Sequence, residues 1–226
     1  MTSEKIYSNL LEYVNTLNED DQKFITKSVN ANCRYGDCGI GTIMLINIMV
    51  DLKEDIAFRN AKQNGNTDSL KAAKDILKAA NKGYRDACKG AWIANGKQIV
   101  TDCYRALRFN TPLELPMIPD SFTPINIEQI FSGVYANSNE YPLPTIGELK
   151  TFIAIEKANG ARKGIAYDIG EDYPLVNAEY LLTMISGLQN CKAYFENAVM
   201  PIYFKGDNGD GLVVPIRRFK TEQESA

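Results

Sequence analysis

Residues 176–219 constrain the fold of this chain more than any other stretch. Asn177 precedes apolar residues that recur at three- and four-residue spacing, which predicts an asparagine-capped amphipathic helix ending near Gly187 and Asn190. The run of Gly, Asp and Asn at 206–211 predicts the turn of a hairpin. Aromatic and β-branched residues predict strands at 193–195, 202–204 and 212–216.

Residues 1–66 predict a helical N-terminal region. The first helix has one apolar face, and Asn18 before three acidic residues predicts the cap of a second helix. A third helix is expected over about 39–60, where the density of apolar residues predicts burial of most of the helix. A polar run then ends the helical pattern. We therefore divide the chain into a helical extension, 1–66, and a second domain, 67–226.

A basic helix opens the second domain. Thr67 or Asp68 can cap a helix over 69–81 that ends at Gly83. Its lysines recur at intervals of three and four residues, so they must share one face. That face has two interpretations: it is simply solvated, or it contacts nucleic-acid phosphates without reading bases. The candidate phosphate-facing residues are Lys71, Lys74, Lys78, Lys82 and Arg85.

A hairpin and a proline-rich insertion follow the basic helix. Asn95-Gly96 lies between apolar runs, which is a strong signal for a two-residue hairpin turn. Six prolines at 111–145 argue against long regular elements there, although a short helix is expected at about 125–131. Beyond the insertion, residues 146–159 predict a helix and 164–168 a strand.

The order of these elements, and several of their residues, resemble the bacterial DNA sliding clamp, the β subunit of the replicative polymerase. Residues 177–182, Asn-Ala-Glu-Tyr-Leu-Leu, are similar to that family's Asn-Ala-Lys-Tyr-Leu-Leu helix start, and 213–217, Val-Val-Pro-Ile-Arg, to its last strand. The likeness covers about 67–110 and 163–219, whereas a whole clamp subunit is longer and contains three such repeats. It implies a helical N-terminal region followed by a clamp-like domain with helices on an antiparallel sheet.

A third motif strengthens the resemblance. Thr101, Asp102 and Arg105 match the family's Thr-Asp-Gly-His-Arg-Leu element, while Cys103 stands in place of Gly and Tyr104 in place of His. In clamps this element and the last strand line opposite walls of a groove that holds short partner peptides. The alternative is that the corresponding residues here pack in a core. The implied groove residues are Thr101, Cys103, Tyr104 and Leu107 on one wall and Leu212, Val214, Pro215 and Ile216 on the other.

The resemblance also implies partners. These are duplex DNA bound without sequence preference and short peptides of replication or repair proteins. A chain of 226 residues is too short to close a ring around DNA, so encirclement requires a homo-oligomer. Edge strands such as 212–219 could pair between its subunits.

Several other classes of protein fit the composition poorly. The chain has no histidine, which excludes Ser-His and Cys-His catalysis, and its five cysteines lack the spacing of a disulfide framework. Cys33 and Cys38 could seed a metal site, but no second pair follows, so we predict no metal and no cofactor. The most apolar run, at 40–50, is too short to cross a membrane, and Met1 is not followed by a signal region. These features predict a cytoplasmic protein with reduced thiols.

We therefore predict a sliding-clamp-like, non-enzymatic, DNA-associated protein that acts as a processivity or partner-recruiting factor. The alternative is a protein-interaction module that keeps a clamp-type peptide groove but does not bind DNA. That alternative predicts that neutralising the helix lysines leaves function intact. An enzyme of unrecognised class is the third hypothesis, and no convergent set of acids or bases supports it.

Overall fold

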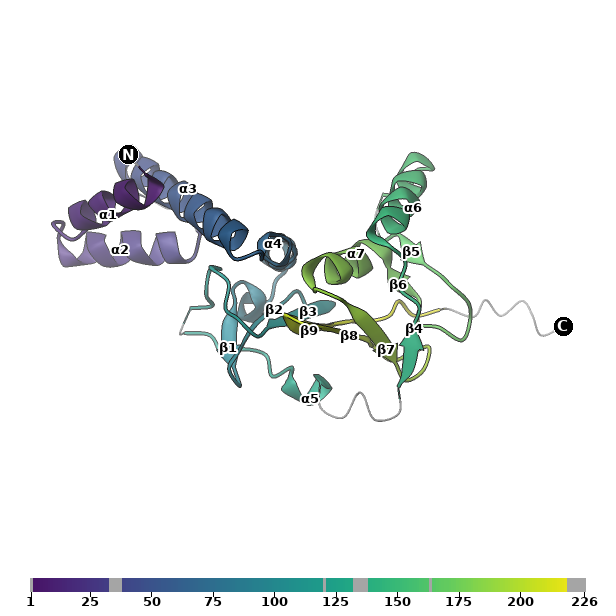
Figure 1. Cartoon of the computed structure of the whole chain (residues 1–226). Helices are drawn as coiled ribbons and strands as arrows, with labels where there is room; N and C mark the ends of the chain where they lie inside the picture. The colour runs from purple at the N-terminus through teal and green to yellow at the C-terminus, as the bar shows by residue number, and fades with distance from the viewer. Residues whose placement is uncertain (1, 33–37, 120, 132–137, 163, 219–226) are drawn as a thin grey trace.

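The computed structural model describes residues 2–32, 38–119, 121–131, 138–162 and 164–218. As predicted, these residues form an α+β protein, in which helices flank an antiparallel sheet (Figure 1). Across the ranges described, no helix has the length and apolar character needed to span a membrane. The helices are α1 (Ser3–Val14), α2 (Glu19–Asn30), α3 (Ile40–Gln63), α4 (Thr67–Lys82), α5 (Glu128–Phe131), α6 (Ile146–Ala158) and α7 (Ala178–Gly187), with a 3₁₀ turn, η1, at Asp86–Cys88.

Helices α1, α2 and α3 form the N-terminal region. Asn18 caps α2 as predicted, because its side-chain oxygen accepts a hydrogen bond from the backbone N–H of Asp21 at 2.9 Å. The last turns of α3 belong to a different core, since Ala57 and Ala61 pack with the sheet domain. Helix α3 therefore joins the two regions. The N-terminal core consists of Val14, Ile25, Val29, Ile46, Met49 and Val50.

Within the described residues, a sheet of seven strands in the order β1-β2-β3-β9-β8-β7-β4 organises the rest of the chain. Two α-β-β-β units supply most of it: α4 precedes β1, β2 and β3, and α7 precedes β7, β8 and β9. Strands β3 and β9 pair at the centre, where Leu107 lies opposite Gly211. The strands are β1 (Trp92–Ala94), β2 (Lys97–Thr101), β3 (Arg105–Phe109), β4 (Asn139–Tyr141), β7 (Lys192–Phe195), β8 (Ile202–Gly206) and β9 (Gly209–Val213).

Both predicted hairpins form, the second with a shorter turn than expected. Asn95 and Gly96 join β1 to β2 with φ of 50° and 75°, the left-handed values that a two-residue turn requires. The second turn contains only Asp207 and Asn208, so β9 begins at Gly209 rather than within 212–216.

The early start of β9 follows from the packing of its glycines. A Cβ on Gly209 would lie 2.1 Å from the carbonyl oxygen of Arg108, and one on Gly211 would lie 2.9 Å from that of Ala106. These glycines therefore allow the central strands to approach closely, rather than reversing the chain.

Strand β9 cannot pair between subunits in the way the sequence suggested. It lies between β3 and β8, so both of its edges are already hydrogen-bonded, and it ends at Val213. The expectation that residues 212–219 form an edge strand is therefore wrong for residues 212–218, the part of this stretch that the structure describes. The strands at the two edges of the sheet are β1 and β4.

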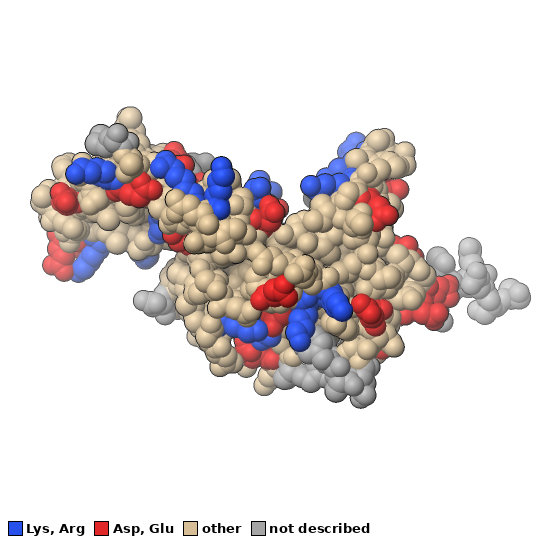
Figure 2. Space-filling model, in the orientation of Figure 1, with Lys and Arg blue, Asp and Glu red and all other residues tan. Residues whose placement is uncertain are grey.

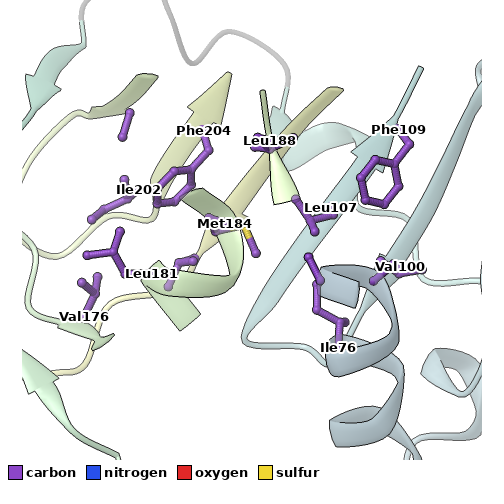
Figure 3. Packing of buried hydrophobic residues seen from close by; sticks show 14 of the residues in the cluster. Ile76, Val100, Leu107, Phe109, Val176, Leu181, Met184, Leu188, Ile202 and Phe204 are labelled. Atoms are coloured by element: carbon purple, nitrogen blue, oxygen red, sulfur yellow. The ribbon is translucent and has the colours of Figure 1, made fainter. Parts of the chain in front are cut away.

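Helices α4 and α7 lie side by side on one face of the sheet. Ile76 of α4 and Met184 of α7 both pack against the sheet beside Leu107 of β3 (Figure 3). The helices can approach closely because position 187 is glycine: a Cβ there would lie 2.6 Å from the Cβ of Ala72. The two α-β-β-β units therefore share one core.

The ends of these helices match the predictions in part. Asn177 caps α7, accepting hydrogen bonds from the backbone N–H groups of Glu179 at 2.8 Å and Tyr180 at 3.4 Å. Helix α4 begins earlier than predicted, and neither Thr67 nor Asp68 caps it, because Asn66 occupies the cap position without a side-chain hydrogen bond.

The proline-rich insertion covers the other face of the sheet. As expected, it holds a short helix, α5, whose residue Phe131 packs in a second core with Trp92 and Tyr203. The insertion also supplies β4, which was not predicted and which pairs with β7 at the sheet edge. Beyond it, helix α6 forms as predicted, with a capping box between Thr145 and Glu148. The predicted strand at 164–168 is reduced to β5 (Ala166–Tyr167), which pairs with β6 (Val176–Asn177).

Candidate functional site

Helix α4 directs its lysines away from the sheet. Its buried residues occupy one side, while Lys71, Lys78 and Lys82 are exposed on the opposite side and Lys74 is half-buried. Arg85 follows the helix and is also exposed. In the space-filling view, blue side chains gather over α3 and α4 and again over α6, on the side of the sheet that the helices cover (Figure 2). Helix α4 therefore presents Lys71, Lys78 and Lys82 on one face, whereas Arg85 lines a separate cavity beside Cys103.

The lysines of α4 differ in their ion pairing. The Nζ atom of Lys71 lies 3.5 Å from a carboxylate oxygen of Asp68. Among the described residues, Lys74, Lys78 and Lys82 have no carboxylate within ion-pair distance. Within the described part of the chain, Lys78 and Lys82 are therefore exposed and unpaired, and Lys74 is unpaired but half-buried.

A groove of about 920 Å³ separates α4 from α2 and α3, and Lys74, Lys78 and Lys82 line it. Lys53 of α3 lines the opposite wall, and burial lowers the pKa of its ammonium group, against a smaller opposing effect of Glu114. The described lining includes four lysines and two glutamates, Glu54 and Glu114, so the groove is basic.

Helix α7 is not basic. Its carboxylate at Glu179 forms an ion pair of 2.7 Å with Lys157 of α6, and it contains no lysine. Helix α6 adds the exposed side chains of Lys150 and Lys157. Basic side chains thus lie on α4, on the neighbouring α3, and on α6 at the far side of α7, rather than covering α4 and α7 equally.

The structure divides the implied groove residues into two sets. Thr101, Leu107 and Leu212 are buried in the sheet, so they do not line a surface groove. Cys103 and Tyr104 reach the surface at the turn between β2 and β3. Beside them lies the segment that follows β9, because the backbone N–H of Val214 donates to the carbonyl of Tyr104 at 2.8 Å. In this segment Val214 is exposed, and Pro215 and Ile216 are partly exposed.

A cavity of about 380 Å³ opens next to this turn. Tyr84, Tyr104 and Tyr180 line it together with Arg85 and Cys88. The rings of Tyr104 and Tyr180 stack with their centroids 6.4 Å apart. Tyr84, Tyr180 and Cys88 were not predicted to contribute to a site, because they come from distant parts of the sequence and carry no shared motif. We call this space the tyrosine cavity.

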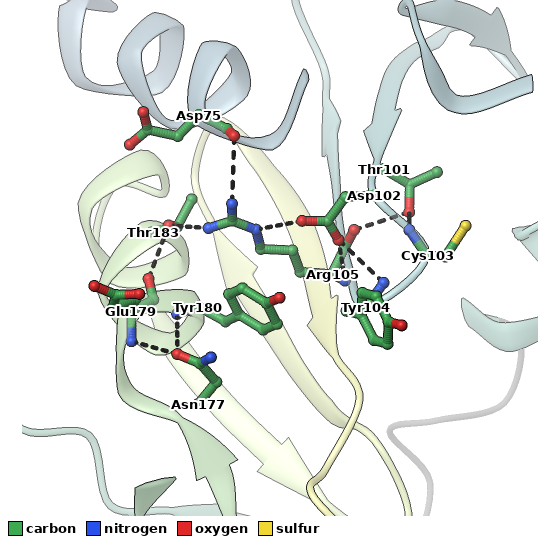
Figure 4. A network of polar contacts seen from close by, with 10 residues as sticks. All are labelled: Asp75, Thr101, Asp102, Cys103, Tyr104, Arg105, Asn177, Glu179, Tyr180 and Thr183. Carbon is green, nitrogen blue, oxygen red and sulfur yellow. Dashed lines mark hydrogen bonds and ion pairs between the residues drawn. The ribbon is translucent and has the colours of Figure 1, made fainter. Parts of the chain in front are cut away.

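A buried arginine holds the wall of the tyrosine cavity in place (Figure 4). Arg105 donates to a carboxylate oxygen of Asp102 at 2.9 Å, to the hydroxyl of Thr183, and to the carbonyl of Asp75 at 3.4 Å. Its guanidinium carbon also lies 4.6 Å from the ring centroid of Tyr180. Arg105 therefore links β3 to both helices and packs against the ring of Tyr180.

The Thr-Asp-x-x-Arg motif shapes the turn itself. Thr101 accepts a hydrogen bond from the backbone N–H of Cys103 at 3.1 Å, and Asp102 accepts from those of Tyr104 and Arg105, each at 3.0 Å. These bonds hold Cys103 at a φ of 75°, a conformation that favours glycine. The matched residues of the motif thus build the local structure, while Cys103 and Tyr104 are presented outward.

The described residues contain no group of three or more Asp, Glu, Cys or His that could hold a metal ion. Cys33 lies outside the described residues, so the metal site that Cys33 and Cys38 could have seeded, which the sequence argued against, is not described. The geometry of both surfaces suits binding: a row of lysines for an anion, and a tyrosine-lined cavity for an apolar or aromatic side chain.

Comparison of this chain with known protein families, curated proteins and solved structures finds no match.

Proposed function

We propose that this chain is a sliding-clamp-like, non-enzymatic protein that associates with duplex DNA without sequence preference. The observation that carries the proposal is the outward lysine face of α4, in which the exposed Lys78 and Lys82 lack an ion pair within the described residues. Lysines spaced along one helix face can neutralise successive backbone phosphates without contacting base edges. The net charge of −3 argues against uniform coating of DNA, so the contact is confined to this face.

The arrangement of the elements supports the same proposal. Two α-β-β-β units place α4 and α7 together on one face of a continuous sheet, with α3 and α6 on either side of this pair (Figure 1). A duplex resting on the helix layer would meet lysines from α4, and one that extended across α7 would also meet the exposed Lys150 of α6. Encirclement of DNA needs more than one copy of the chain, and the sheet edges β1 and β4 are where copies could pair.

The experiment is light scattering of the purified chain with and without a duplex of random sequence, at low and at high salt. We expect a complex at low salt whose mass exceeds that of one chain plus one duplex, and which dissociates at high salt because released counterions drive binding. A chain that stays monomeric and does not bind the duplex at either salt concentration would contradict the proposal.

The tyrosine cavity favours a second candidate function, the recruitment of proteins through short peptides. The segment that follows β9 lies beside the cavity, and Tyr84 and Tyr104 are 89% and 60% exposed. Exposed aromatic side chains around a pocket typically anchor peptide side chains. This function needs no lysine face and could exist without DNA binding.

Selection from a displayed library of short linear peptides tests this candidate. Peptides enriched on the wild-type chain should lose binding to the Tyr104→Ala variant. They should keep it on Tyr13→Ala, which removes a tyrosine of similar exposure, 54%, from α1. An equal loss of peptide binding in both variants would contradict a peptide-binding role for the cavity, and so would a selection that enriches no peptide.

A further inference from the structure

Two free cysteines meet in the wall of the tyrosine cavity. The Sγ atoms of Cys88, in η1, and Cys103, in the turn between β2 and β3, lie 3.3 Å apart. The S–S bond of a disulfide is about 2.05 Å long, so the sulfurs need to approach by only about 1.2 Å. The folded chain therefore already holds the two thiols close to bonding distance.

The two sulfurs have different surroundings. Cys88 is 1% exposed, and burial raises the pKa of its thiol to about 12. Cys103 is only partly buried, lines the cavity, and accepts a long hydrogen bond of 3.8 Å from the guanidinium of Arg85. The partly exposed Cys103 sulfur is the one that a dissolved peroxide can reach, and the hydrogen bond from Arg85 holds it at the cavity. Cys103 is therefore placed as the sulfur oxidised first, with Cys88 held beside it as a protonated partner.

We propose that Cys88 and Cys103 form a peroxide-sensitive dithiol that closes into an intramolecular disulfide. The Cys103 thiolate attacks an oxygen of hydrogen peroxide, the O–O bond breaks, a sulfenic acid forms, and the departing hydroxide takes up a proton as water. The Cys88 sulfur then attacks the sulfenic sulfur, the S–O bond breaks, and the Cys88 proton leaves with hydroxide as a second water. The thiols lose two electrons in all, and one peroxide is reduced to two waters.

The disulfide would change the cavity and not only the thiols. Both cysteines belong to the wall of the tyrosine cavity, so the bond joins η1 to the turn that carries Tyr104. It also removes the thiol that accepts a hydrogen bond from Arg85. Oxidation thus links the redox state of the surroundings to the shape of the cavity wall. Formation of the bond does not depend on whether the chain binds DNA or peptides.

The test uses the full chain with Cys33→Ser, Cys38→Ser and Cys191→Ser, so that only the two proposed cysteines remain. After hydrogen peroxide treatment and alkylation, intact mass should show the loss of two hydrogen atoms and no alkylation. Peptide mapping should find Cys88 linked to Cys103, and a dithiol reductant should restore both thiols. Two alkylated thiols, or a Cys103 sulfinic acid beside an alkylated Cys88, would overturn the proposal.

Two further arms test whether the fold positions the sulfurs. The same chain unfolded in urea should form the disulfide many-fold more slowly, and equal rates would overturn the proposal. The Arg85→Gln variant should oxidise several-fold more slowly than the parent, whereas Lys82→Gln, a nearby exposed cation without a bond to Cys103, should match it. Equal rates for Arg85→Gln and the parent would overturn the role given to Arg85.

Discussion

Arg108 of β3 and Asp210 of β9 lie directly opposite each other at the centre of the sheet, joined by hydrogen bonds of 2.6 and 2.8 Å. Their side chains are only 11% and 12% exposed. Lys97 of β2 pairs with Asp210 at 2.7 Å, and Glu128 of α5 pairs with Arg108 at 2.7 Å. The guanidinium carbon of Arg108 also lies 3.7 Å from the ring centroid of Phe131. This charge network thus joins the two α-β-β-β units through Arg108 and Asp210, and it links the proline-rich insertion to them through Glu128.

Removing the carboxylate of this network should destabilise the fold strongly. Asp210→Ala leaves the buried guanidinium of Arg108 without its main partner, and breaking a buried pair in this way costs about 3–5 kcal/mol. Asp207→Ala is the matched control, because Asp207 lies in the same hairpin but is exposed and bonds to the exposed side chain of Asn190. Urea unfolding should show a large loss of unfolding free energy for Asp210→Ala and less than about 1 kcal/mol for Asp207→Ala. Similar midpoints for both variants would contradict the role of the network.

The contact between α4 and α7 should not tolerate a methyl group at position 187. Because a Cβ at Gly187 would lie 2.6 Å from that of Ala72, Gly187→Ala should cost about 1–3 kcal/mol through overpacking. Adding Ala72→Gly should recover part of this loss. The control is Gly41→Ala in α3, where a Cβ meets no atom within 4 Å, so that a gain of up to about 1 kcal/mol is expected. A neutral Gly187→Ala would mean that the helices are more loosely packed than described.

Local signals in the sequence predicted most of the secondary structure. Asn18 and Asn177 cap their helices, and Asn95-Gly96 turns its hairpin, because each of these features depends on residues only a few positions apart. The predicted bounds of β9 were wrong, since Gly209 and Asp210 pair with residues of β3 about a hundred positions away along the chain. Strand β4 was missed for the same reason: nothing in its short polar sequence shows that it pairs with β7.

The candidate sites also differ in whether they depend on residues close together in the sequence or on long-range packing. Helical spacing placed the α4 lysines on one face, as the structure does. The tyrosine cavity could not be read from the sequence, because Tyr84, Tyr104 and Tyr180 converge only through the packing of α4, α7 and the β2–β3 turn. The proximity of Cys88 and Cys103 depends on the same packing.

Alkaline pH should weaken the fold through its buried thiols. Partial burial raises the pKa of the Cys191 thiol from 9.0 to about 12, so the unfolded chain loses this proton first as the pH rises. The unfolding free energy should therefore be unaffected by this group below pH 9 and decline between pH 9 and about pH 12, by at most about 1.4 kcal/mol per pH unit. Cys191→Ala should make the measured decline shallower than that of the wild type. Parallel declines for wild type and Cys191→Ala would contradict the burial of this thiol.

The central claim is that the outward face of α4 contacts DNA phosphates, and the salt dependence of duplex binding tests it most directly. Fluorescence anisotropy with a labelled duplex would compare the wild type with a variant carrying Lys71→Gln, Lys78→Gln and Lys82→Gln. The control variant carries Lys5→Gln, Lys23→Gln and Lys27→Gln, which remove the same charge from exposed positions on α1 and α2. We predict weaker binding for the α4 variant, with a logarithmic salt slope reduced by up to about 0.9 for each phosphate that the variant no longer neutralises, and near-wild-type behaviour for the control. No binding by the wild type at low salt, or equally weakened binding in both variants, would contradict the claim.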